Sequence, residues 1–187
     1  MLRVLALVVL AGSLTACGGD ISFPPPPQRN LISHSVSHPI SAVLGMSADE
    51  GDMPWASILG DILPPSEGAD WRWTREHPSV QFDLMDSDGW KATARITAVD
   101  KVLATTGPQH VAMLVNGSRV GSATLSATGN YTLSFPVDPT LLKSGSPAVL
   151  SLDIEPCSED PSRSEKGRGL CVLLHSIGFR KEAGQAP

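Results

Sequence analysis

Apolar and polar side chains alternate along much of the chain after residue 70. The alternation has a period of two in four stretches, residues 79–84, 91–98, 130–135 and 150–155. Successive side chains of a β-strand point to opposite faces of a sheet. Each stretch therefore predicts a strand with one buried and one solvated face.

Residues 110–125 contain the clearest strand pair. An apolar run is followed by Asn116 and Gly117, and a second strand-like stretch comes directly after them. Asparagine and glycine tolerate the positive φ angles that a type I′ turn requires. The segment therefore predicts a β-hairpin whose first arm is buried on both faces.

The last predicted strand has a break in its alternation. Val172 and Leu174 occupy even positions, whereas Ile177 and Phe179 occupy odd positions. One face of a strand can hold all four side chains only if an extra residue lies between the two pairs. We therefore predict a β-bulge near residues 175–176.

The segment before residue 71 is less regular. Residues 40–45 are compatible with a first strand. Residues 53–65 are compatible with a short helical turn that has four apolar side chains on one side, Trp55, Ile58, Leu59 and Ile62, although proline and glycine limit its length. With about seven or eight short strands and no long helix, the chain is predicted to be all-β, an antiparallel, jelly-roll-like β-sandwich over residues 40–181.

The first residues have the pattern of a bacterial export signal. Arg3 precedes the apolar run 4–10, which is too short to span a bilayer. Residues 14–17 are LTAC, and they resemble the lipobox of bacterial lipoproteins. The resemblance implies that a signal peptide, residues 1–16, is removed and that Cys17 becomes a lipidated N-terminus.

The residues that follow predict a tether. Residues 17–39 include four consecutive prolines and show no apolar period, which is typical of an extended spacer. His34 and His38 lie in this segment, where a solvated linker is favoured over a metal site. Residues 182–187 are expected to be a flexible tail.

The resemblance to lipoproteins also predicts a location. Gly18, and not aspartate, follows the lipidated cysteine, and in the families that the signal resembles this permits export to the outer membrane. We expect a membrane partner through the N-terminal lipid. The expected location is the bacterial cell envelope, at the outer membrane and facing the periplasm.

Charge and motifs narrow the classes of function. The formal net charge is −5 and no basic cluster is present, so nucleic acid is not expected as a partner. The sequence lacks a Gly-x-Ser-x-Gly elbow, a His-Glu-x-x-His pair and a glycine-rich phosphate loop. We therefore expect no catalytic residues, no cofactor and no enzymatic activity.

Two cysteines remain beyond the lipobox. In an oxidising envelope compartment Cys157 and Cys171 are predicted to form a disulfide, and zinc is disfavoured because no paired histidine lies nearby. Asp83, Asp86 and Asp88 partly resemble a calcium loop. Leucine stands where the first oxygen ligand belongs, so a polar turn is favoured and no metal is expected.

Five pieces of the sequence occur in an informative order. They are "WRWT", "AMLVNGSRVGSATL", "TLSFPV", "VLSLDIEP" and "GLCVLLHSIGF". Together they resemble the jelly-roll, galactose-binding-like accessory domains that bacteria encode with membrane glycosyltransferases and other envelope-glycan machinery. The resemblance covers residues 71–180. It implies a fold and a glycan-related setting, and it supplies no catalytic residues.

Trp71 and Trp73 lie on the same face of a predicted strand. Trp73 is assigned to the core, whereas for Trp71 a core position and an exposed ligand platform stay equally open. The candidate ligand-binding residues are Trp71, Arg72 and Trp90.

Two functions remain open from the sequence. One is a tethered, non-catalytic binding module for envelope or extracellular polysaccharide. The alternative is a structural subunit that docks another envelope protein.

Overall fold

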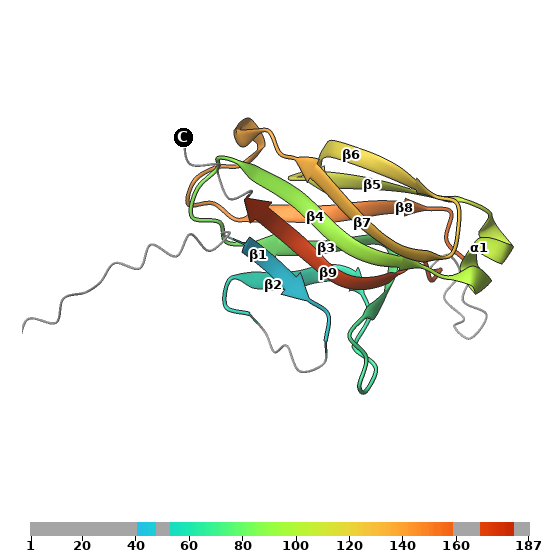
Figure 1. The fold of residues 1–187 in the computed structure, drawn as a ribbon. Helices are drawn as coiled ribbons and strands as arrows, with labels where there is room; N and C mark the ends of the chain where they lie inside the picture. The colour runs from blue at the N-terminus through green and yellow to red at the C-terminus, as the bar shows by residue number, and fades with distance from the viewer. Residues whose placement is uncertain (1–40, 48–52, 159–168, 182–187) are drawn as a thin grey trace, which may run out of the picture. The chain divides into compact units, whose positions relative to one another are not determined.

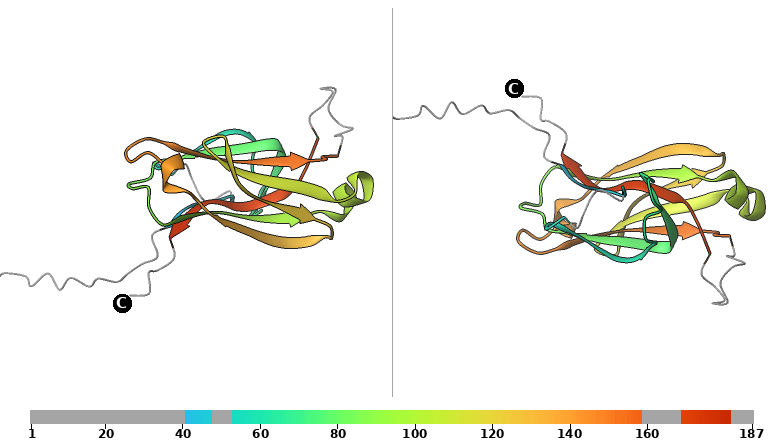
Figure 2. Two further views of the ribbon diagram at one scale, coloured as in Figure 1. Left: turned by 90° about the horizontal axis from the view of Figure 1, so that it is seen from above. Right: turned by 90° about the horizontal axis from the view of Figure 1, so that it is seen from below.

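The strands of this protein pack as two antiparallel layers with the core between them (Figures 1 and 2). The computed structural model describes residues 41–47, 53–158 and 169–181. Its strands are β1 Ser41–Gly45, β2 Ala56–Ile62, β3 Arg72–Phe82, β4 Trp90–Ala98, β5 Gln109–Val115, β6 Ser118–Leu125, β7 Gly129–Pro136, β8 Ala148–Glu155 and β9 Leu173–Lys181. Two short helices, α1 Asp100–Thr106 and the 3₁₀ helix η1 Pro139–Leu141, connect strands.

Each layer has a simple strand order. One runs β2-β3-β8-β5-β6 and the other β1-β9-β4-β7. The start of β3 joins them, because Arg72 and Trp73 pair with Leu174 and Leu173 of β9, whereas the end of β3 pairs with β8. The predicted antiparallel β-sandwich is confirmed, with nine strands in the described residues.

The bulge predicted in the last strand is confirmed. Arg95 of β4 pairs with Ser176, and the next residue, Ile96, pairs with Leu174. His175 is therefore the extra residue of β9. The two apolar residues before it and the two after it are all fully buried: Val172, Leu174, Ile177 and Phe179.

The predicted hairpin is also confirmed. Asn116 and Gly117 have φ angles of 49° and 80°, and they join β5 to β6 as a two-residue turn. The Asn116 side chain also links the turn to two other segments by hydrogen bonds. Its Nδ2 donates to the Leu141 carbonyl at 2.7 Å, and its Oδ1 accepts from the Val149 backbone N–H at 2.8 Å.

The segment 40–62 contains one correct and one wrong prediction. β1 occupies the predicted first strand, but the predicted helical turn is strand β2, paired with β3. Two register shifts, one on each side of Gly60, interrupt the alternation of β2. These irregularities gave its apolar residues a spacing close to that of a helix, and they leave Ile58 and Leu59 37% and 54% exposed.

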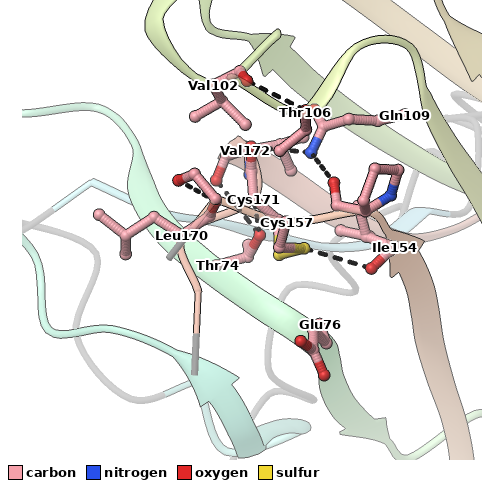
Figure 3. Close-up of a disulfide and its surroundings, with 12 residues drawn as sticks. Thr74, Glu76, Val102, Thr106, Gln109, Ile154, Cys157, Leu170, Cys171 and Val172 are labelled. Atoms are coloured by element: carbon pink, nitrogen blue, oxygen red, sulfur yellow. Dashed lines mark hydrogen bonds between the residues drawn. A yellow bond between two sulfur atoms is a disulfide. The ribbon is translucent and has the colours of Figure 1, made fainter. Parts of the chain in front are cut away.

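The predicted disulfide is confirmed, with a Cα–Cα distance of 4.6 Å between Cys157 and Cys171. Beside it, Ser158 and Leu170 exchange two backbone hydrogen bonds of 3.0 and 2.9 Å. Gln109, at the start of β5, is fully buried there (Figure 3). Its Nε2 donates to the carbonyls of Pro156 and Cys171, so it ties β5 to the segments that carry both half-cystines.

The expected signal peptide, Cys17, the tether and the tail lie outside the described residues, so they stay predictions. Within the described part of the chain, no helix has the length and apolar character needed to cross a membrane.

We expect Cys157→Ser to destabilise the domain by about 3 kcal/mol, because the bridge closes a loop of the size for which chain entropy gives that value. Urea unfolding with and without reductant measures the effect. The difference between wild type and variant should largely vanish under reducing conditions. Two free thiols from these positions in unfolded, unreduced protein would contradict the disulfide.

We expect Gly178→Ala to destabilise the fold by about 1–3 kcal/mol, because overpacking forces neighbours apart. A Cβ at Gly178 would come within 2.1 Å of the Ala42 backbone oxygen in β1, so the two strands must separate. Gly60→Ala is the matched control, since its Cβ would meet nothing within 4 Å. Equal unfolding free energies for the two variants would show that β1 yields without cost.

Candidate functional site

Trp71 and Trp73 form an aromatic pair at the start of β3. Both side chains are half-buried, and their rings meet edge to face with centroids 6.3 Å apart. Neither residue belongs to the buried core or to the partly buried side chains that pack against it. The assignment of Trp73 to the core is therefore wrong. At this position β3 does not yet pair with β8 and pairs instead with Leu173 of β9.

Trp90, by contrast, is a core residue, so its prediction as a ligand-binding residue is wrong. It is only 3% exposed and meets Phe179 edge to face at 6.2 Å. Its Nε1 donates to the carbonyl and carboxylate oxygens of Asp86. Because Trp90 begins β4 on the inward face, with Ala92 and Ala94, its ring has no open face for a ligand.

Asp86, one of the three aspartates of the calcium-like sequence, forms an ion pair with Lys181. Lys181 Nζ lies 2.6 and 2.7 Å from its two carboxylate oxygens. The hydrogen bond from Lys181 is the main cause that lowers the pKa of Asp86 below its usual 3.8. The same ammonium lies 4.9 Å from the centre of the Trp90 ring, so this cluster closes one end of the core.

Arg72, the remaining candidate, supports the aromatic pair from the other face of β3. Its Nε donates to the Met46 carbonyl at 3.3 Å, and its side chain is half-buried. Met46 follows β1, and its own N–H donates to the His175 carbonyl. Arg72 therefore ties the start of β3 to the segment after β1.

A hollow of about 280 Å³ lies close to this tie, on the outer face of the β1-β9-β4-β7 layer. It is lined by Val43, Gly45, Met46, Ser47, Asp70, Arg95, His175, Ser176 and Arg180. Two outward rows, Arg95 with Ser176 and Lys91 with Arg180, flank the row of Thr93 and Gly178. Because this middle row has small side chains or none, the sheet surface is low between the arginines.

His175, the bulge residue, connects the hollow to neighbouring polar groups. Its Nε2 lies 2.8 Å from Thr97 Oγ1, and Thr97 in turn donates to Asn130 Oδ1. Its Nδ1 is buried, has no hydrogen-bond partner among the described residues, and lies 3.8 Å from Asp70 Oδ2. Asp70 immediately precedes Trp71, so the aromatic pair directly follows a lining residue of the hollow in the chain.

A second hollow, of about 390 Å³, lies on the outer face of the opposite layer. It is lined by His110, Val111, Ala112, Arg119, Ser122, Ala123, Thr124, Asp153 and Glu155, and none of these is a tryptophan, tyrosine or phenylalanine. Two of its polar groups already have partners, since His110 bonds Thr124 at 3.1 Å and Asp153 lies 3.2 Å from His77. We therefore place the candidate site at the smaller hollow, because its lining residue Asp70 directly precedes Trp71.

Sequence reasoning found the tryptophan Trp71 and the bulge at His175, but it missed Asp70, Arg95 and Arg180. The two arginines lie on the polar faces of alternating strands, where charged residues are ordinary. The available signal was the bulge itself, because bulges are enriched next to functional sites and redirect side chains.

Comparisons with known proteins find fold resemblance only. No family model and no curated protein matches the chain. A structure of the acetyl xylan esterase Est2A from the rumen bacterium Butyrivibrio proteoclasticus is 14% identical with a TM-score of 0.41, and the match covers 76% of this chain and 32% of that one. The chain thus spans about a third of the esterase structure.

Two carbohydrate-binding modules of Paenibacillus barcinonensis are matched over nearly their whole length. The CBM35 structure is 10% identical with a TM-score of 0.39, and the match covers 75% of this chain and 99% of that one. The CBM22-1 xylan-binding domain of Xyn10C is 12% identical with a TM-score of 0.34, with coverage of 76% and 95%. At these identities and TM-scores, the resemblances concern the fold alone.

We expect Lys181→Met to lower stability at pH 7 by up to about 1 kcal/mol, the upper end for ion pairs open to solvent. The pKa of Asp86 is lowered in the folded state, so the pair stabilises above the unfolded pKa and this contribution is lost as pH falls through the folded pKa. Urea unfolding at pH 7 and below pH 3.8 should show a difference that shrinks with acid. Lys101→Met, on α1, is the control, and a difference independent of pH would contradict the pairing.

Proposed function

We propose that the sandwich is a non-catalytic binding module for polysaccharide, and that Trp71, Trp73 and the hollow beside them form its site. One observation carries the proposal. Two half-buried tryptophans lie outside the core, and Trp71 directly follows Asp70, which lines a hollow with hydroxyl, carboxylate, imidazole and guanidinium groups. A sugar ring needs both parts, an aromatic surface for its apolar face and polar groups for its hydroxyls.

The polar network supports binding over catalysis. Asp70, His175 and Thr97 follow one another in the order of a catalytic triad, but the Asp70 and His175 atoms are 3.8 Å apart, beyond hydrogen-bond distance. Thr97 lies inside β4, paired on one side with Asn130 and on the other with Leu173. A nucleophile needs unpaired N–H groups aimed at a developing oxyanion, and a residue between two paired strands offers none.

The proposed setting is the bacterial cell envelope, with the module held at the outer membrane by a lipid on Cys17. Support comes from the lipobox-like residues 14–17 and from the proline-rich residues 17–39, which give a spacer between membrane and sandwich. A tethered module of this kind keeps a polysaccharide near the membrane without modifying it.

One observation favours the alternative, docking of another envelope protein. On β2, Ile58 and Leu59 are 37% and 54% exposed, and among the described residues β2 pairs only with β3. An exposed apolar strand at a sheet edge can pair with another chain. Glycan binding remains the first proposal because the tryptophan site combines aromatic and polar groups.

We expect Trp71→Ala to weaken polysaccharide binding at least tenfold, since exposed aromatic anchors carry a large share of binding energy. Titration calorimetry against a panel of soluble polysaccharides measures the loss, and quenching of tryptophan fluorescence by acrylamide checks that the Trp71 ring is open to solvent. Leu59→Ala, an exposed apolar position on β2, is the matched control. Wild-type affinity in Trp71→Ala, or loss in Leu59→Ala alone, would contradict the proposed site.

A further inference from the structure

The hollow beside the tryptophans carries two arginines that no described residue neutralises by an ion pair. Arg95 and Arg180 both line it, and both side chains are exposed. Among the residues that the structure describes, neither arginine forms an ion pair. Among the described lining residues the only acidic one is Asp70, whose carboxylate lies 3.8 Å from His175. This local excess of cations stands out in a chain with a formal net charge of −5.

The register of the strands places the two arginines at opposite ends of the hollow. Arg95 is level with Ser176 of β9, and Arg180 lies four residues farther along that strand, about 13 Å at the usual rise per residue. Between them is the low row of Thr93 and Gly178. Long side chains from both ends can therefore reach a group that sits in the middle of the hollow.

Guanidinium chemistry narrows what that group can be. Arginine presents a planar set of donors that matches a carboxylate with two parallel hydrogen bonds. The other lining groups suit hydroxyls, since Ser176 is a hydroxyl side chain and the exposed carboxylate of Asp70 accepts hydrogen bonds. A hexuronic acid has both features, a carboxylate and hydroxyls on one ring.

We propose that this hollow selects acidic polysaccharides, with Arg95 and Arg180 pairing with the carboxylates of hexuronate units while Trp71 and Trp73 contact the sugar at the rim. The inference rests on the proposed glycan-binding function and specifies its ligand class. In a polyuronate, carboxylates recur along the chain, so the two arginines can engage one unit or two successive units.

The test compares acidic polymers with matched neutral ones. Polygalacturonate, alginate and hyaluronan are titrated calorimetrically beside their carboxyl-reduced forms, which keep the linkages and lose the charge. At least one acidic polymer should bind at least tenfold more tightly than its reduced form. Its affinity should fall steeply as salt rises from low to physiological concentration, because exposed charges are screened.

Single substitutions then locate the effect. Arg95→Gln and Arg180→Gln should each weaken binding of the acidic polymer about tenfold and leave binding of the reduced form unchanged. The lysine variants should be intermediate, because lysine keeps the charge and loses the planar donor set. Arg119→Gln is the matched control, since Arg119 is an exposed arginine that lines the hollow on the opposite layer. Unfolding midpoints confirm that all variants fold.

The outcomes separate this inference from the proposed function. Equal binding of acidic and reduced polymers, with loss in Trp71→Ala, would retain the glycan function and overturn the acidic specificity. Dextran sulfate binding as tightly as the polyuronate, or equal damage by Arg119→Gln, would overturn it too, because the surface would then respond to charge alone. No binding of any polymer would overturn both proposals.

Discussion

The architecture depends on one extra residue in the last strand. β9 pairs with β1 and β3 along one edge and with β4 along the other, so it is an inner strand of its layer. Without the bulge at His175, either Val172 and Leu174 or Ile177 and Phe179 would turn outward, and half of the apolar contribution of this strand would be lost. The same bulge redirects His175 to the outer face, where it reaches Thr97 and approaches Asp70. One irregularity thus completes the core and builds the polar side of the candidate site.

The start of β3 has a comparable double role. Here β3 pairs with β9 and not with β8, and Arg72 donates a hydrogen bond to the Met46 carbonyl. Thr74, fully buried one residue after Trp73, exchanges hydrogen bonds with Val172, which follows Cys171. The disulfide and Gln109 hold that same region against β5 and β8. The tryptophan pair therefore stands on a backbone fixed from several directions, which limits the entropy that a ligand must remove on binding.

The core and the proposed binding site contain different aromatic residues. Trp90, Phe82 and Phe179 pack together in the core, with ring contacts of 5.4 and 6.2 Å. Trp71 and Trp73 contact each other and stay outside that cluster. Residues of the second pair are free to serve a ligand because the sandwich does not need them to fill its interior. The arginines of the hollow are likewise exposed and unpaired within the described residues, so their charges are available to a partner.

The sequence by itself determined the features that depend on neighbouring residues. Strands with regular alternation, the Asn116–Gly117 turn and the bulge at His175 follow from local side-chain direction and backbone preference. The Cys157–Cys171 bridge was predicted on the expectation that Cys17 carries a lipid, which leaves these two cysteines to pair. The tertiary structure alone decided which faces are covered and which distant residues meet. Trp90 lies in the core. Strand β2 was not predicted, because its register shifts disturb the period of two. Asp70 lies near His175, although the two residues are far apart in the chain. Such contacts are set by the register between strands far apart in the chain, and a period of two records only that a side chain faces outward, not what lies beside it.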